Sequence, residues 1–180
     1  MVLKTKSFQT YHQIMKEKDL NLSLLTKTSE LNRLVEMLIK IESKFLLPRD
    51  ENISLQLYAL KLINKAVTII VSDKNHDIGL LSFYANDYVG KNAFCSSIGV
   101  ISSHRGGSIA RNLVKFGFDY LYEIGMETIR TEVDKKNLGV VSFLKNFNFH
   151  IESETEENTY ILVADLKNHQ IPFYEKWEKK

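Results

Sequence analysis

The clearest pattern in the chain is an apolar stripe between residues 109 and 124. One residue in every three or four is apolar here, namely Ile109, Leu113, Phe116, Tyr120 and Ile124. This spacing places the apolar side chains on one face of a helix. Gly125 follows directly and predicts the end of that helix. The stretch before it, residues 93–100, is short, apolar and bounded by polar turns, which is typical of a buried strand.

The same two periodicities predict the other elements. Helices are expected at residues 11–20, 29–41, 54–64 and 138–146, with Thr28 or Ser29 capping the second. Strands are expected at residues 20–25, 66–72, 78–85, 93–100, 128–133, 149–154 and 159–166. A right-handed crossover through the helix at 109–124 makes strands 93–100 and 128–133 parallel. The tail 167–180 is expected to fold back through Ile171, Phe173 and Trp177. The sequence therefore predicts a mixed α/β sheet with helices on both faces.

Composition narrows the class of protein. The chain has 180 residues, so a single domain over 1–180 is expected, and 44% hydrophobic and 26% charged residues are typical of a globular chain. A net charge of +2 gives no reason to expect nucleic acid or a membrane as partner. One cysteine, Cys95, rules out an internal disulfide framework. No stretch approaches the roughly 20 apolar residues of a membrane span, and residues 1–10 lack a signal-peptide core. We therefore expect a cytoplasmic protein.

A glycine-containing turn joins the strand at 93–100 to the following helix. Its residues are Arg105, Gly106, Gly107 and Ser108. The first N–H groups of a helix lack intrahelical partners and, with the helix dipole, favour an anion such as a phosphate. The turn is neither a P-loop, because no Lys-Ser/Thr pair follows the glycines, nor a G-x-G-x-x-G dinucleotide fingerprint.

Two motifs in this region resemble the GNAT acyltransferase family over about residues 66–166. Arg105, Ser108 and Ala110 match the marked positions of motif A, [Q/R]-x-x-G-x-[G/A], with serine replacing the first glycine. Motif B, N-x-x-A-x-x-[L/F]-Y-x-x-x-G-F, is matched by Asn137, Val140, Phe143 and Phe149. Leu144 replaces the tyrosine that is common in the family, and Asn148 replaces the glycine.

The resemblance implies a GNAT-like, mostly antiparallel sheet with a central parallel strand pair that splays apart. It implies acetyl-CoA as donor, with the pyrophosphate on the N–H groups of residues 105–110 and the pantetheine arm beside the strand ending at Val100. The expected donor-binding residues are Ile98, Gly99, Val100, Arg105, Gly106, Gly107, Ser108, Ile109, Ala110, Asn137, Val140, Phe143 and Leu144. Asn137 also suits a helix cap. The helices at 29–41 and 54–64 would form part of the acceptor wall, together with the loop at 45–52.

Acetyl transfer to an amine needs a group that removes a proton from that amine. Glu132 is the leading candidate for the base, and Asp134 is a weaker one; the alternative is that Glu132 is a solvated edge carboxylate. Tyr84 is the nearest hydroxyl expected to assist the leaving thiolate, since Leu144 has no proton to give. It belongs to a polar-aromatic turn with Asn86, Asp87 and Tyr88, read either as a plain hairpin turn or as the rim of the acceptor site. The N–H of Val100 is expected to bind the carbonyl oxygen.

Other chemistries have little support. Cys95 lies on a predicted buried strand with no histidine placed to activate it, and the scattered histidines show no metal-ligand spacing. The stretch F-Y-A-N-D before residue 93 is similar to GNAT proteins of bacterial surface-polysaccharide clusters, which implies an amino-sugar nucleotide as one acceptor. Other small amines and a peptide N-terminus stay open, as do a monomer and a homodimer. The alternative class is a non-catalytic CoA-binding or regulatory module, favoured by Ser108 and Leu144.

Overall fold

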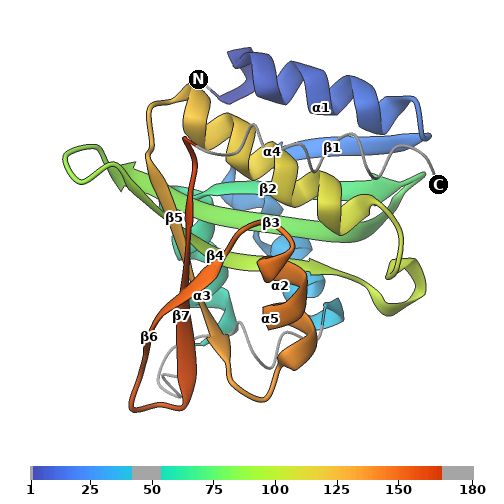
Figure 1. The fold of residues 1–180 in the computed structure, drawn as a ribbon. Coiled ribbons are helices and arrows are strands. Elements are labelled where there is room, and N and C mark those ends of the chain that lie inside the picture. The colour runs from blue at the N-terminus through green and yellow to red at the C-terminus, as the bar shows by residue number, and fades with distance from the viewer. Residues whose placement is uncertain (1, 42–53, 168–180) are drawn as a thin grey trace.

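A seven-stranded sheet forms the centre of the computed structural model, which describes residues 2–41 and 54–167. The strand order is β1-β2-β3-β4-β5-β7-β6, and only β4 and β5 are parallel (Figure 1). The strands are β1 (Leu20–Leu25), β2 (Val67–Asp73), β3 (His76–Asp87), β4 (Asn92–Val100), β5 (Thr128–Asp134), β6 (His150–Glu154) and β7 (Thr159–Asp165). The mostly antiparallel sheet with one central parallel pair is confirmed.

Helices cover both faces of this sheet, as expected. Figure 1 shows α1, α4 and α5 on the near face and α2 and α3 behind the sheet. Their bounds are α1 (Lys6–Lys16), α2 (Leu31–Lys40), α3 (Leu55–Lys65), α4 (Ile109–Glu123) and α5 (Leu138–Lys145). Short 3-10 turns lie at Val2–Lys4, Thr28–Glu30 and Ser102–His104.

Alternation along the central strands divides the interior into two cores. Leu81 and Phe83 of β3 pack under α4, whose Gly117 lies directly above them. Leu80, one residue along, points the other way and packs with α2 and α3. Because successive strand residues face opposite sides, the sheet is buried on both faces.

The first helix runs antiparallel along α4. The Glu123 carboxylate, near the end of α4, accepts hydrogen bonds from the N–H groups of Lys6 (2.7 Å) and Ser7 (2.8 Å) at the start of α1. Midway, the Tyr11 hydroxyl donates to Asp119 at 2.7 Å, and the Tyr11 ring meets Phe116 edge-on. The two helices are therefore joined along most of the length of α1.

The predicted bounds of this first helix, residues 11–20, were wrong. The helix starts five residues earlier, at Lys6, where the Thr5 side chain caps it by accepting from the Phe8 N–H, and it ends at Lys16. Phe8, Tyr11 and Met15 form its buried stripe at steps of three and four residues. The predicted strand at residues 20–25 is confirmed.

The other predicted elements are confirmed with small shifts in their ends. Strands β2 and β3 extend further into their turns than expected, and Gly125 ends α4 with φ +86°. Neither Thr28 nor Ser29 caps α2, because both lie in a 3-10 turn that places Glu30 at the cap position. The expected loop at 45–52 and the tail at 168–180 lie outside the described residues.

An ion pair fixes α2 to the sheet. The Arg33 guanidinium donates two hydrogen bonds to the Asp77 carboxylate, both 2.8 Å, and one to the Ser72 hydroxyl at 3.2 Å. Burial favours the neutral form of Asp77, but the hydrogen bonds from Arg33 and Ser72 outweigh it and lower the pKa of the carboxyl. Helix α2 is therefore held at a defined position behind β2 and β3.

Candidate functional site

Strands β4 and β5 separate halfway along their length. Their parallel pairing runs from Asn92–Thr128 to Cys95–Thr131 and stops there. Strand β4 continues to Val100 along β3, while β5 continues to Asp134 along β7. We call the opening between the two diverging strands the fork. It is the splayed pair that the sequence predicts, and Figure 1 shows the two strands diverging.

A β-bulge lies at the point where the fork opens. Phe83 of β3 pairs with Cys95, but the preceding Ser82 pairs with Ser97, so Ser96 is an extra residue on β4. Bulges bend a strand and increase its local twist. The bulge therefore turns β4 away from β5 directly after their last pair.

Backbone groups of β4 face the fork. The Ile101 N–H donates to the Ile78 carbonyl of β3 at 3.0 Å. Because successive strand residues direct their backbone groups to opposite edges, Ile98 and Val100 direct theirs away from β3, towards the fork. The fork thus offers a strand edge that can pair with an extended, amide-containing ligand.

A cluster of hydroxyl groups surrounds the bulge on the face covered by α2 and α3. The Tyr58 hydroxyl of α3 lies 2.8 Å from Ser96 Oγ, 2.8 Å from Ser97 Oγ and 3.2 Å from the Ser96 carbonyl oxygen. Burial raises the pKa of Tyr58 and also that of Tyr84. Both phenols therefore stay protonated at neutral pH.

Sequence reasoning treated Tyr58 only as an apolar position of its helix. The available signal was weak, because a tyrosine at helical spacing is usually a core residue. The pair Ser96-Ser97 inside an otherwise apolar strand was the better indication that a polar partner packs there.

Glu132 is the first residue of β5 beyond the last pair with β4. Ile129, Thr131 and Val133 are buried, so the intervening Glu132 points to the opposite face, the one that carries Tyr84. The Thr159 hydroxyl of β7 donates to its Oε1 at 2.5 Å. The carboxylate is half-buried and oriented, which does not fit a freely solvated edge residue.

Asp134, the weaker candidate for the base, has a structural contact. Its Oδ1 accepts the Lys136 N–H at 2.8 Å in the turn between β5 and α5. This contact uses one carboxylate oxygen to hold the turn.

The turn before α4 has the geometry expected of an anion site. Gly106 adopts φ +82°, which favours glycine, and a Cβ at Gly107 would meet nothing closer than the His104 carbonyl at 3.8 Å. Ser108 is the cap residue of the 15-residue α4, and its side chain makes no capping bond. The backbone at the helix start is therefore open to a ligand on the Gly107 side.

Arg105 is held by two carbonyl oxygens. Its Nε donates to Val100 at 2.9 Å and its Nη2 donates to Ile41 at 3.3 Å. A Cβ on Gly99 would lie 2.9 Å from the Ile41 Cβ, so the end of α2 packs directly on β4. Arg105 thus joins the end of β4 to the end of α2, a positioning role that the sequence did not indicate.

The remaining predicted donor residues fall into two groups. Ile109 is buried in the core against Gly79, which leaves its N–H but not its side chain for a ligand, and Ala110 is half-buried in the same first turn. On α5, the Asn137 side chain caps the helix by accepting from the Val140 N–H at 3.3 Å, so its predicted role as a cap is confirmed.

The residues of α5 after its cap lie partly in the near-face core. Val140 and Phe143 are half-buried, and the Phe143 ring contacts Phe147. Leu144, at the position of the family's tyrosine, is 4% exposed among apolar neighbours. No hydroxyl group stands at this position.

Cys95 and the potential metal ligands give two further observations. Cys95 is buried, and desolvation raises its pKa to about 12, so a thiolate nucleophile there is strongly disfavoured. Within residues 2–41 and 54–167, no group of three or more His, Cys, Asp or Glu side chains is arranged to hold a metal ion.

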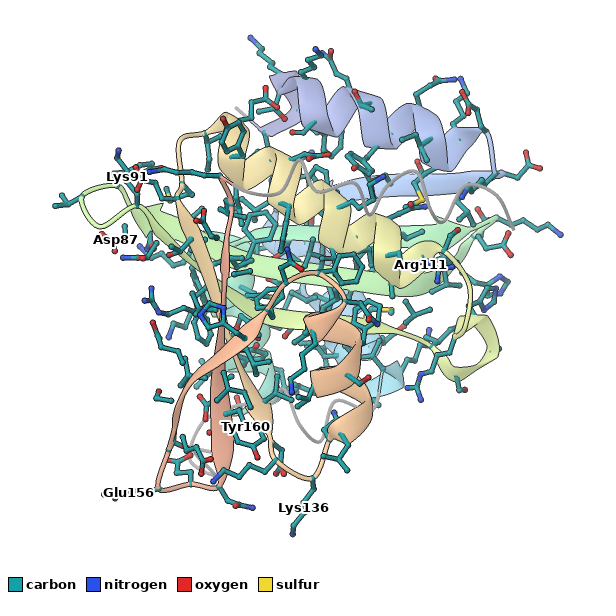
Figure 2. All side chains as sticks on the ribbon, in the orientation of Figure 1. Asp87, Lys91, Arg111, Lys136, Glu156 and Tyr160 are labelled. Atoms are coloured by element: carbon teal, nitrogen blue, oxygen red, sulfur yellow. The ribbon has the colours of Figure 1, made fainter. Side chains whose placement is uncertain are left out.

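The residues of the predicted polar-aromatic turn lie at two different places. Tyr84 lies at the bulge, but Asp87 accepts from the Gly90 N–H at 2.8 Å and stabilises the β3–β4 turn. Figure 2 shows Asp87 and Lys91 at the end of the molecule opposite Arg111, which is near the start of α4. Asp87 therefore has the role of a hairpin-turn residue.

Comparison with protein families identifies the class. Residues 33–149 match the model of the acetyltransferase (GNAT) family. The chain belongs to this family of acyltransferases, as its motifs, fork and helix-start turn indicate. No curated protein sequence matches the chain significantly.

Solved structures share the fold at low sequence identity. Spermidine N-acetyltransferase from Vibrio cholerae, in complex with CoA and spermine, superposes with a TM-score of 0.68 at 17% identity, covering 86% of this chain and 99% of that one. The ribosomal-protein-S18-alanine N-acetyltransferase from Escherichia coli gives a TM-score of 0.63 at 15% identity, covering 82% and 94%. The GNAT domain of S. lividans PAT gives 0.68 at 13% identity, covering 81% and 90%.

In the part of the chain that the structure describes, no helix is both long and apolar enough to cross a bilayer.

Proposed function

We propose that the protein is an N-acetyltransferase that moves the acetyl group of acetyl-CoA directly to a primary amine of a small acceptor. The observation that carries this proposal is the fork, with an unpaired β4 edge on one side and the oriented Glu132 carboxylate on the other. The single cysteine of the chain supports a reducing compartment such as the cytoplasm.

The donor fits the residues present. The pantetheine arm contains amides, which suit the backbone edge of Ile98 and Val100 at the fork. The pyrophosphate suits the open turn at residues 105–108 and the first N–H groups of α4. When bound there, acetyl-CoA supplies the activated acetyl group.

Proton removal is assigned to Glu132. The acceptor amine attacks the thioester carbonyl, a C–N bond forms, and the C–S bond breaks to release the CoA thiolate. The amine proton passes to the Glu132 carboxylate or to a water that it holds. The hydrogen bond from Thr159 keeps that carboxylate in one orientation.

The carbonyl oxygen needs an N–H donor as negative charge develops. We assign this role to the N–H of Ile98 and leave that of Val100 to the pantetheine arm. Ile98 lies closer along β4 to the last pair at Cys95, and therefore closer to Glu132, than Val100 does. This assignment replaces the expectation from sequence, which gave the role to Val100.

The leaving thiolate needs no acid at residue 144. A thiolate is a good leaving group, because its conjugate thiol has a pKa of roughly 8.5 when CoA behaves like cysteine. It can leave as the anion or take a proton from water. We assign an assisting role to the hydroxyl of Tyr84, a residue next to the bulge that packs on the α2/α3 face.

The acceptor is expected on the face that carries Tyr58, Tyr84 and Glu132, in front of α2 and α3. Neighbouring structures have acceptors as different as spermidine and a ribosomal-protein alanine, so the fold does not select among them. An amino-sugar nucleotide remains the acceptor suggested by sequence, and a peptide N-terminus is the alternative.

A panel of amines tests the proposal directly. Purified protein with acetyl-CoA should release free CoA thiol when one of the polyamines, amino-sugar nucleotides or amino-terminal peptides is present, and not in its absence. CoA binding without thiol release on any of these amines would favour the non-catalytic module, whose supporting observation is Leu144.

A further inference from the structure

One lysine outside the family-matched residues reaches the start of α4. Lys18, in the turn between α1 and β1, places its Nζ 3.0 Å from Ser108 Oγ. The match to the family model begins at residue 33, so it does not include this lysine. The contact is made at the residue where serine replaces the glycine of motif A.

The position of Lys18 is determined by α1. The helix is fixed to α4 through Glu123 at one end and through Tyr11 and Asp119 midway. In the turn that follows, the Lys18 N–H donates to the Met15 carbonyl at 2.9 Å and the Asp19 N–H to the Lys16 carbonyl at 3.0 Å. The backbone of Lys18 is therefore held in a hydrogen-bonded turn next to α1.

The guanidinium of Arg105, the cation within the turn at residues 105–108, is engaged by backbone oxygens. Two N–H groups of the Arg105 guanidinium serve the carbonyls of Val100 and Ile41. The Lys18 ammonium has three donors, of which Ser108 uses one, so two are left for another acceptor.

We propose that Lys18 is a donor-binding residue that supplies positive charge to the phosphate groups of acetyl-CoA at the start of α4. This inference rests on the proposed function. A phosphate at the α4 start would accept from the backbone N–H groups of the turn and from Lys18 at once, with Ser108 Oγ holding the ammonium beside it. The turn after α1, which lies outside the matched residues 33–149, then forms part of the donor site.

The test is calorimetric titration of CoA into wild type and two variants. Lys18→Met keeps most of the length of the side chain and removes its charge, and Lys16→Met is the matched control at the exposed last residue of α1. We expect Lys18→Met to weaken CoA binding about tenfold at low salt, the scale of one charge-assisted hydrogen bond, and Lys16→Met to leave it unchanged. The loss should shrink in 0.5 M salt, because screening weakens the charge interaction in the wild type.

A second ligand separates charge from packing. The rate with S-acetylpantetheine, which lacks the phosphates, should be the same for Lys18→Met and wild type. Equal CoA affinity of the two proteins, or a loss that persists with S-acetylpantetheine and at high salt, would overturn the inference while leaving the proposed function intact. A wild type that binds no CoA would overturn both.

Discussion

Ser96 and Glu132 occupy equivalent positions on the two arms of the fork, since each is the first residue beyond the last β4–β5 pair, Cys95–Thr131. Each is also held by a hydroxyl from a different element: Ser96 by Tyr58 of α3, and Glu132 by Thr159 of β7. The two arms are thus fixed independently, which lets variants test them one at a time.

Glu132→Gln tests the β5 arm. The amide keeps the shape but cannot take a proton, so turnover should fall about 10²-fold at neutral pH. The deficit should shrink as pH rises, because more of the acceptor amine is already neutral. Steady-state rates between pH 6 and 10 measure this, with Asp134→Asn as the control that leaves turnover nearly unchanged. Parallel pH–rate profiles for wild type and Glu132→Gln would exclude Glu132 as the base.

Tyr58→Phe tests the β4 arm. It removes one hydroxyl and its contacts with Ser96 and Ser97, so stability should fall by about 1–2 kcal/mol. The matched control is Tyr11→Phe, which removes a partly buried hydroxyl bonded to Asp119 on the opposite face of the sheet. Both should lower the unfolding midpoint in urea, but only Tyr58→Phe should lower kcat/KM, by about tenfold, because the bulge loses its support. Equal kcat/KM for the two variants would show that the bulge does not contribute to catalysis.

Gly107→Asp tests the helix-start turn. The open space around this position tolerates a side chain, so the variant should fold, while its carboxylate repels the pyrophosphate. CoA affinity by calorimetry should fall at least about tenfold, whereas the uncharged Gly107→Ala should fall much less. Unchanged CoA affinity in a folded Gly107→Asp variant would show that the pyrophosphate does not bind at this turn.

Leu144→Ala tests the position of the missing tyrosine. Because Leu144 is buried, the truncation should lower the free energy of unfolding by about 2–4 kcal/mol. Assayed well below the melting temperature, it should raise the KM for acetyl-CoA more than it lowers kcat. If Leu144→Tyr raised turnover by orders of magnitude, the missing acid would prove to be a real defect.

Asp77→Asn tests the attachment of α2. The lowered pKa of Asp77 means that its stabilising effect is present above the pKa of the unfolded chain and is lost as pH falls through the folded value. Wild type should therefore exceed Asp77→Asn by about 1–2 kcal/mol at pH 7, and the gap should narrow below about pH 4. Urea unfolding at pH 7 and pH 3 checks both values; a gap that is equal at the two pH values would contradict the ion pair.

Local patterns predicted the elements well where apolar spacing was clean. The stripe from Ile109 to Ile124 and the apolar strand before it located the turn, and the motif match predicted the splayed strand pair. The start of α1 was predicted wrongly, although the sequence carries the signal. Phe8, Tyr11 and Met15 have helical spacing, and Thr5 precedes them. The predicted range began at Tyr11, so it left out both Phe8 and the Thr5 cap.

The contacts that define the site could not be predicted from the sequence, for a different reason. Tyr58 meets Ser96 across 38 residues, and Lys18 meets Ser108 across 90. No local periodicity encodes which polar groups meet at such separations. Arg105 shows the same limit. Its motif position suggested that it binds a phosphate, but its partners are two backbone carbonyl groups that the fold brings to it.

The insertion of β7 between β5 and β6 has a consequence for the order in which the protein is made. The β5 edge that carries Glu132 stays without its antiparallel partner until residues 159–165 have been synthesised. Distant pairings of this kind form late, after the local helices and hairpins. The donor-side turn can therefore be complete while the base is still unoriented, and chemistry should begin only when the last described strand has entered the sheet.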